Sequence, residues 1–88
     1  MQIEYVRVDD LIPYIKNPKK HPKEQVNLIA SSIKEFGFIN PIIVDKDNEI
    51  IAGHGRLLAA KKLGLEKVPV IKAEHLTPAQ VKAYRIAD

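Results

Sequence analysis

Residues 50–60 read Ile50-Ile51-Ala52-Gly53-His54-Gly55-Arg56-Leu57-Leu58-Ala59-Ala60, and this is the most informative stretch of the sequence. Its three apolar residues at the start predict a strand, and residues 55–63 predict a helix that ends at Gly64. A Gly-x-Gly turn therefore joins a strand directly to a helix. The first N–H groups of a helix lack intrahelical partners and lie at its positive dipole end, so they favour an anion. Glycines let an anion approach the backbone, and Arg56 offers paired donors. The stretch predicts a phosphate-binding turn, although glycines needed only for tight packing give the same pattern.

The rest of the chain predicts a small α+β domain with a mixed β-sheet and packed helices, in the order β-α-β-β-α-β-α. Strands are expected at residues 3–8, 41–44, 50–52 and 68–71, and helices at 22–36, 55–63 and from 77 onward. The acidic segment 45–49 is expected to be the turn of a hairpin. Pro69 restricts its strand to a sheet edge or a strand start. An Asp side chain is expected to cap a short helical turn at residues 9–12.

The last helix has the clearest start. Thr77 is suited to the cap position, Pro78 to the first turn, and Gln80 completes a capping box. No stop follows before Asp88, which is typical of a chain cut from a longer one. Residues 1–75 are therefore expected to form the domain, and residues 76–88 to begin a helix that leads into a downstream region.

The composition excludes several classes of protein. The chain has 88 residues, of which 45% are hydrophobic, so it predicts one folded domain with one core. It has 0 cysteines, which excludes disulfides, thiolate zinc sites and cysteine nucleophiles. No apolar run approaches the roughly 18 residues of a membrane-spanning helix. The first residues lack the pattern of a signal peptide, so a cytoplasmic location is expected.

Positive charge gathers in two stretches that contain no acid. The net charge is only +3, but residues 16–23 and 54–62 hold most of the candidate contacts to a polyanion. The candidate nucleic-acid-binding residues are Lys16, Lys19, Lys20, Lys23, Lys61 and Lys62. Solvated surface gives the same composition. If the two stretches meet in the fold, they form a basic patch.

Few other side chains suggest chemistry. His54 is a weak candidate for proton transfer or a phosphate contact, and the alternative is a turn histidine in solvent. Asp45, Asp47 and Glu49 have oxygen ligands for a cation such as Mg²⁺, but a hairpin turn explains them as well and is preferred. No metal site is predicted. Aromatic residues near the lysines can stack on bases, although most are needed for the core.

Several motifs appear in an order that resembles the ParB/sulfiredoxin superfamily, specifically the N-terminal domain of ParB, often called a ParB-like nuclease domain. These motifs are Ser32-Ile33-x-x-x-Gly37-x-x-Asn40-Pro41-Ile42, Ala52-Gly53-His54-Gly55-Arg56, Leu63-Gly64 and Val68-Pro69-Val70. The resemblance covers residues 3–75. Residues 17–21 and 83–88 look most like ParB-like domains fused ahead of phage-type DNA methyltransferases.

The resemblance implies a nucleotide site at the strand-to-helix turn, because ParB uses CTP there, related kinases an adenine nucleotide, and sulfiredoxin ATP. Gly53 and Arg56 match the first and last residues of the family's Gly-Glu-Arg-Arg motif. Asn40 takes the place of Gln in its Gly-x-x-Gln-Pro motif. The implied nucleotide-binding residues are Gly37, Asn40, Pro41, Gly53, His54, Gly55 and Arg56. The implied cofactor is a nucleoside triphosphate of the CTP or ATP type, with Mg²⁺.

This sequence departs from the family at two motif positions. His54 replaces the family's Glu, and Gly55 replaces its first Arg, so one carboxylate and one phosphate donor are missing. The reactive cysteine of sulfiredoxin falls at His54, which excludes sulfinic-acid reduction. The helix-turn-helix domain with which ParB reads DNA is absent from these residues.

Three functions follow as expectations. The first is a domain that binds nucleotide phosphates, DNA or both, as the N-terminal accessory part of a larger DNA-modifying or partition protein. The second is an enzyme: a nuclease, a nucleotide triphosphatase or a small-molecule kinase. The third is a protein-interaction module without nucleotide. The expected partners are DNA, a nucleotide and a fused or partner DNA-modifying domain, with no membrane and with a homodimer left open.

Overall fold

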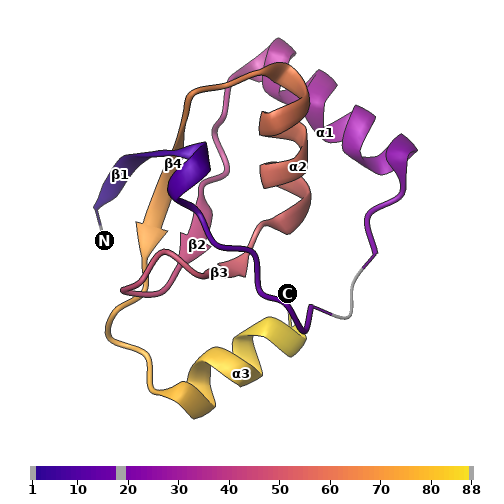
Figure 1. Cartoon of the computed structure of the whole chain (residues 1–88). Coiled ribbons are helices and arrows are strands. Elements are labelled where there is room, and N and C mark those ends of the chain that lie inside the picture. Colours follow the sequence, from indigo (N-terminus) through magenta and orange to yellow (C-terminus); the bar gives the residue numbers. More distant parts are fainter. Residues whose placement is uncertain (1, 18–19, 88) are drawn as a thin grey trace.

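The computed structural model of the chain describes residues 2–17 and 20–87. These residues form four strands and three α-helices, as Figure 1 shows. The strands are β1 (Ile3–Arg7), β2 (Ile42–Val44), β3 (Ile50–Ala52) and β4 (Lys67–Lys72). The helices are α1 (Lys23–Phe36), α2 (His54–Leu63) and α3 (Pro78–Ala87), and a short 3-10 turn, η1, spans Val8–Asp10. The predicted α+β class and element order are confirmed.

The four strands form one mixed sheet in the order β1-β4-β2-β3. β1 pairs antiparallel with β4, β4 pairs parallel with β2, and β2 and β3 form an antiparallel hairpin. The prediction that Pro69 lies in an edge strand or at a strand start is wrong, because β4 lies between β1 and β2 and begins at Lys67. Pro69 pairs with Tyr5 of β1, but the pairing with β2 begins only at Val70. The proline therefore lies where β4 has a neighbour on one side, which is a position that tolerates a missing N–H.

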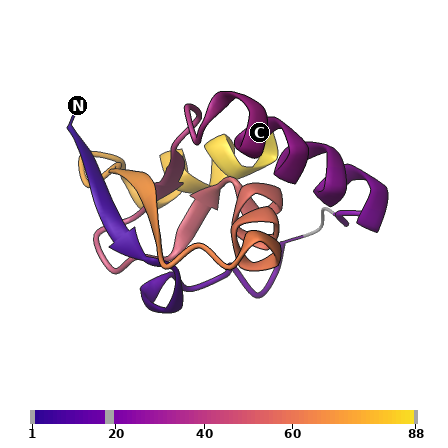
Figure 2. The same cartoon turned by 90° about the horizontal axis from the view of Figure 1, so that it is seen from above.

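α2 lies between the sheet and α1, as the view from above shows (Figure 2). One side of α2 packs with the sheet through Leu57 and Ala60, in a cluster that includes the fully buried Ile42, Val44, Ile50, Val68 and Val70. Its other side packs against α1 through Ala59, which contacts a second cluster around Val26 and Ala30. Because both sides of α2 are buried, its first turn has a fixed position relative to β3 and α1.

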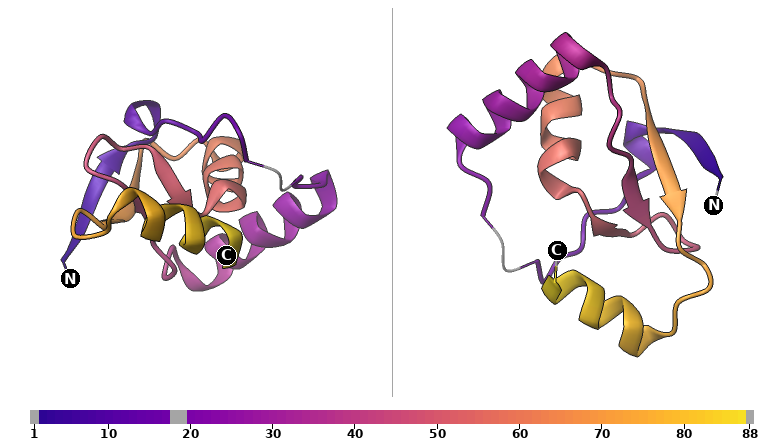
Figure 3. Two further views of the ribbon diagram at one scale, coloured as in Figure 1. Left: turned by 90° about the horizontal axis from the view of Figure 1, so that it is seen from below. Right: turned by 180° about the vertical axis from the view of Figure 1, so that it is seen from behind.

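α3 lies apart from α1 and α2 and contacts β3, as the view from behind shows (right panel of Figure 3). None of its described residues is buried. The predicted capping box is confirmed: the Gln80 N–H donates to Thr77 Oγ1 at 3.2 Å, and the Thr77 N–H donates to Gln80 Oε1 at 2.9 Å. The start of α3 is therefore held by its own side chains, whereas its packing on the domain is sparse.

Two other local predictions have different outcomes. The hairpin turn at residues 45–49 is confirmed, because Asp45 Oδ1 accepts the N–H of Asp47 at 2.8 Å and that of Glu49 at 3.0 Å. The predicted Asp cap near residue 9 is wrong, because η1 begins at Val8 and its cap residue, Arg7, makes no side-chain cap hydrogen bond. Among the described residues, no helix combines the length and apolar character needed to cross a bilayer.

Candidate functional site

A cavity of about 210 Å³ opens where β3 passes into α2. It is lined by the turn at residues 53–56, by part of the loop before α1, by α1 itself and by Arg85 of α3. The loop is fixed to the β2–β3 hairpin by two backbone bonds of 2.9 Å, from the Ile12 N–H to the carbonyl of Asn48 in the turn and from the Ile50 N–H of β3 to the Ile12 carbonyl. These bonds place Tyr14 beside the start of α2. Elements from both ends of the chain therefore meet at the turn that the sequence singles out.

Gly53 and Arg56 form one structural unit at this turn. Gly53 is the cap residue of α2 and has a φ of 107°, a conformation that favours glycine. A Cβ at this position would lie 3.0 Å from Nη2 of Arg56. The Arg56 guanidinium thus folds back over Gly53, and its Nη2 donates to the carbonyl of Pro41 at 3.0 Å. The first intrahelical hydrogen bond of α2 runs from the Leu57 N–H to the Gly53 carbonyl. The backbone N–H groups of residues 54–56 therefore have no acceptor within the helix itself.

Gly55 has a packing role. It is buried in the first turn of α2, and a Cβ there would lie 3.0 Å from Cδ1 of Ile29 and 3.1 Å from Nδ1 of His21. The absence of a side chain lets α2 approach α1 and the loop that precedes it. Of the two explanations of the Gly-x-Gly turn, tight packing therefore applies to Gly55. Its backbone also lines the cavity, so its predicted contact with phosphate stays a prediction.

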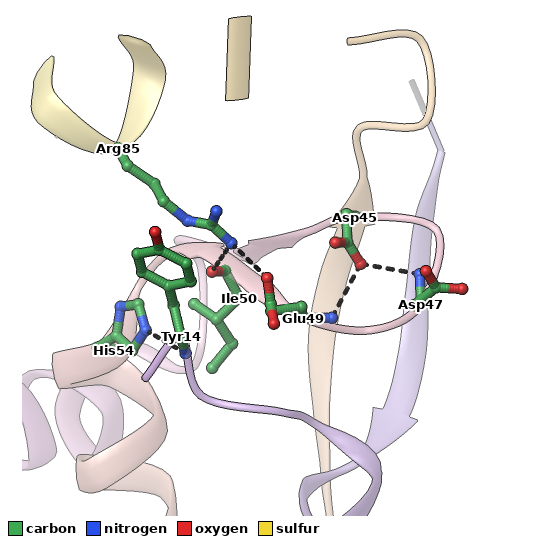
Figure 4. Close-up of polar contacts among 7 residues, drawn as sticks. All are labelled: Tyr14, Asp45, Asp47, Glu49, Ile50, His54 and Arg85. Atoms are coloured by element: carbon green, nitrogen blue, oxygen red, sulfur yellow. Dashed lines mark hydrogen bonds and ion pairs between the residues drawn. The ribbon is translucent and has the colours of Figure 1, made fainter. Parts of the chain in front are cut away.

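His54 is half-buried, which corrects the expectation of a turn histidine in solvent. Its Nε2 accepts the backbone N–H of Tyr14 at 3.1 Å, as Figure 4 shows. A neutral imidazole that accepts at Nε2 carries its proton at Nδ1. His54 therefore ties the first turn of α2 to the loop. Its catalytic role stays a prediction.

A second hollow of about 200 Å³ lies on the other side of Arg56 and shares Ile29 with the cavity. Its lining is largely apolar and includes Phe38, Ile39 and the amide of Asn40. Arg56 lines both hollows and bonds to Pro41, so the structure brings together the two motifs of the implied nucleotide site. Gly37 ends α1 and lines neither hollow.

Arg85 is the site residue that sequence reasoning missed. Its Nη2 donates to Glu49 Oε1 at 3.1 Å and to the Ile50 carbonyl at 2.9 Å. Its guanidinium lies 3.6 Å from the centroid of the Tyr14 ring (Figure 4). The only signal in the sequence was an arginine on the apolar side of an amphipathic helix. That signal does not say which cavity the side chain reaches.

The structure places the candidate lysines in two groups. Lys16 and Lys20 are exposed in the loop, and Lys23 is exposed at the start of α1. Lys61 and Lys62 occupy the last turn of α2, roughly 12 Å from its first turn at 1.5 Å per residue. Lys62 contacts Asn27, which is one turn beyond Lys23 on α1, so the two basic stretches approach each other there. Lys19 lies outside the described residues.

The acidic turn is used for structure. Oδ1 of Asp45 accepts two backbone N–H groups, and the carboxylate of Glu49 contacts Arg85. Within residues 2–17 and 20–87, no group of three or more His, Cys, Asp and Glu side chains is arranged to hold a metal ion.

The family model of the ParB N-terminal domain matches residues 1–88, and the chain therefore belongs to this family. The ParB-like nuclease domain-containing protein YnaK of Escherichia coli (strain K12) is 45% identical over 80 residues, which cover 91% of this chain and 92% of YnaK. The sequence-based assignment to the ParB N-terminal domain is confirmed.

Several solved structures share the fold of this chain. The chromosome-partitioning protein ParB of Caulobacter crescentus, complexed with CTP-γ-S, matches with a TM-score of 0.85 and 26% identity over 98% of this chain. The same protein complexed to the centromeric parS site matches with a TM-score of 0.75 and 23% identity, over 94% of this chain and 44% of that one. Sulfiredoxin from Arabidopsis thaliana matches with a TM-score of 0.78 and 20% identity, over 96% of this chain and 97% of that one, so the two chains share a fold. This chain spans 51% of the ParB chain bound to CTP-γ-S.

Proposed function

We propose that this chain binds the triphosphate of a nucleotide in the cavity at the start of α2. The observation that carries the proposal is the chemistry of the lining, where Arg56 and Arg85 meet the first turn of a helix. Among the described residues that line the cavity, none is Asp or Glu. Arginine guanidinium groups and a helix N-terminus together are well suited to phosphate oxygens.

The second hollow gives the rest of the nucleotide a place beside Arg56. Its apolar lining suits the faces of a base, and the Asn40 amide can both donate to and accept from the base edge. CTP and ATP are the two candidates. Mg²⁺ would be held mainly by the phosphates and by water, since the cavity lining offers cationic groups in place of carboxylates.

We further propose that the domain is a nucleotide-binding accessory part of a DNA-modifying or partition protein. The relative from Caulobacter is named as a chromosome-partitioning protein and was solved with CTP-γ-S and with parS DNA. Lys16 and Lys20 are exposed in the loop that contributes to the cavity lining, Lys23 is exposed at the start of α1, and all three would add contacts to DNA phosphates. A fused DNA methyltransferase, as in the sequences that residues 83–88 resemble, is one arrangement, and a homodimer is another. A nuclease would need metal-bound carboxylates to activate water, and no described contact supports that alternative.

The nucleotide part is tested by calorimetric titration with CTP, ATP and tripolyphosphate, with and without Mg²⁺. We expect Arg56→Ala to weaken binding by at least about tenfold, because it removes charge-assisted hydrogen bonds. Arg7→Ala is the matched control: Arg7 is an exposed arginine on β1, and its contact is a 3.6 Å ion pair with Asp9. Arg56→Lys tests the charge without the forked geometry, and circular dichroism establishes that each variant is folded. Absence of binding to all three ligands, or equal losses in the Arg56 and Arg7 variants, would refute the proposal.

The DNA part is tested by fluorescence anisotropy with a labelled duplex. Phosphate contacts should make the affinity fall steeply with salt. The double variant Lys16→Gln/Lys20→Gln should reduce both the affinity and the salt slope, whereas Lys34→Gln, an exposed lysine in the last turn of α1, should change neither. If the affinity does not depend on salt, the lysines do not contact DNA phosphates.

A further inference from the structure

We infer that Glu49 sets the affinity of the cavity for anions, because it competes with them for the guanidinium of Arg85. The inference rests on the proposed function, namely that phosphate oxygens enter this cavity. It adds a way in which the affinity for anions is set, because a carboxylate on the hairpin partly neutralises an arginine of the proposed binding site. The argument begins with how Arg85 is held.

Three groups that lie far from Arg85 in the sequence fix its guanidinium, one on Tyr14 and two on the neighbouring residues Glu49 and Ile50. Its flat face lies 3.6 Å from the centre of the Tyr14 ring. One nitrogen, Nη2, donates both to the Ile50 carbonyl and to Glu49 Oε1. The side chain is 16% exposed, so it is largely buried before any ligand arrives. The arginine is therefore pre-positioned, and little conformational entropy is lost when an anion meets it.

The same guanidinium has capacity left for an anion. It carries five N–H donors, and both of its described bonds use the single atom Nη2. Its Nε is buried and has no hydrogen-bond partner among the described residues. The side chain lines the cavity together with Gly53 and His54. A phosphate oxygen in the cavity would therefore meet an arginine whose charge is shared with Glu49.

Glu49 can release the Arg85 guanidinium when an anion binds. Its side chain is 37% exposed, so the carboxylate can turn toward water without being buried unpaired. Its backbone does not depend on Arg85, because its N–H is held by Asp45 Oδ1 at 3.0 Å. A negative charge beside the cavity also repels a polyanion directly. Both effects have the same sign, and both predict that Glu49 lowers the affinity for anions.

The alternative is that the Arg85–Glu49 pair only anchors α3. None of the described residues of α3 is buried, so polar contacts would have to hold the helix on the domain. The two roles give opposite expectations for the loss of the Glu49 charge. If the pair is only an anchor, its weakening loosens α3 and anion binding falls or stays the same. If Glu49 competes, anion binding becomes tighter.

Calorimetric titration of the whole chain with tripolyphosphate tests the inference. Glu49→Gln keeps an oxygen that accepts from Arg85 but removes the charge, and we expect tripolyphosphate to bind about twofold to fivefold more tightly. Arg85→Gln should weaken binding by about tenfold. Lys82→Gln removes the same charge from an exposed position on α3 and should change binding by less than about twofold. Arg85→Lys should fall between the wild type and Arg85→Gln, because it keeps the charge and loses the fork.

The outcomes separate this inference from the proposed function. If the wild type binds tripolyphosphate and Arg56→Ala weakens binding as expected, but Glu49→Gln binds equally or more weakly, the competition is refuted and the phosphate site stands. If Arg85→Gln and Lys82→Gln weaken binding equally, Arg85 acts only through net charge and the inference also fails. If the wild type binds no polyphosphate or nucleotide, both proposals fail. Hydrogen exchange in α3 establishes that it stays docked in Glu49→Gln, so a change in affinity is not a loss of α3.

Discussion

Replacing Gly53 by alanine tests whether the turn and Arg56 form one structural unit. Gly53 has a φ of 107°, where an L-residue with a Cβ is strained. The new methyl group would also lie 3.0 Å from Nη2 and 3.2 Å from Cζ of Arg56. Because the carbonyl of Pro41 holds the guanidinium, a shift of Arg56 away from the methyl group strains or breaks that hydrogen bond. Gly53→Ala should therefore carry two costs, one from the backbone and one from Arg56.

The magnitude follows from those two terms. Backbone strain of this kind costs about 1 to 2 kcal/mol. Loss of the half-buried, charge-assisted bond between Arg56 and Pro41 costs about 1.5 kcal/mol more. The expected destabilisation is about 2.5 to 3.5 kcal/mol, a large part of the stability of a domain of this size. In a thermal melt, this corresponds to a drop in Tm of at least about 10 °C.

Urea unfolding followed by circular dichroism measures this free energy, and Gly64→Ala is the matched control. Gly64 ends α2 with a φ of 71°, and a Cβ there has no atom within 4 Å, so alanine at this position meets backbone strain alone. We expect Gly64→Ala to cost about 1 kcal/mol, less than half the cost at Gly53. Equal losses at the two glycines would show that the contact between Gly53 and Arg56 contributes nothing. A loss at Gly53 that is undiminished in an Arg56→Ala background would lead to the same conclusion.

Three further predictions concern the frame around the site. Asp45→Ala should lower the free energy of unfolding by about 1 to 2 kcal/mol, because two backbone N–H groups of the hairpin turn lose their acceptor, whereas Asp45→Asn should keep most of the wild-type stability. Urea unfolding measures both variants, and an alanine variant as stable as the wild type would contradict the role of Asp45 in the turn. Thr77→Ala should lower the stability of α3 by about 1 kcal/mol and speed amide hydrogen exchange in its first turn, because it breaks the capping box. Uniform exchange rates along α3 in both the wild type and the variant would contradict this prediction. Ile42→Ala should lower the free energy of unfolding in urea by about 2 to 5 kcal/mol, because the Ile42 side chain is 0% exposed. Ile39→Ala, at a position 79% exposed, should lower it little, and similar losses at the two positions would contradict the assignment of the core.

The fold could be predicted from the sequence where local chemistry determines it. Thr77 and Gln80 identify the start of α3, and the composition of residues 45–49 identifies a turn, because side chains bond to nearby backbone in both cases. The position of Pro69 was mispredicted for the opposite reason. A proline shows that its residue donates no hydrogen bond, but the neighbours of a strand depend on pairings between distant segments. Here β1 and β2 lie on either side of β4, and the second neighbour begins only at Val70.

The same distinction holds within the candidate site. Arg56 follows Gly53 by three residues, so a strand, a glycine turn and a helix were enough to indicate that it lies near the turn. The burial of His54 was missed because it depends on Tyr14, which is 40 residues away along the chain. Arg85 was missed because its partners lie 35 and 36 residues away. Each of these contacts requires the packing of α3 or of the first loop on β3, and no local pattern encodes that packing.

Arg85 also bears on where the functional unit ends. From the sequence, a domain is expected at residues 1–75, because the family resemblance ends there. The sheet and both hydrophobic clusters indeed lie within those residues. The cavity does not, since Arg85 forms part of its lining from α3. A segment that adds no buried residue to the core can thus supply a charged group to a binding site. We therefore propose that the unit that binds phosphate includes α3, and that stability and binding depend on different parts of this chain.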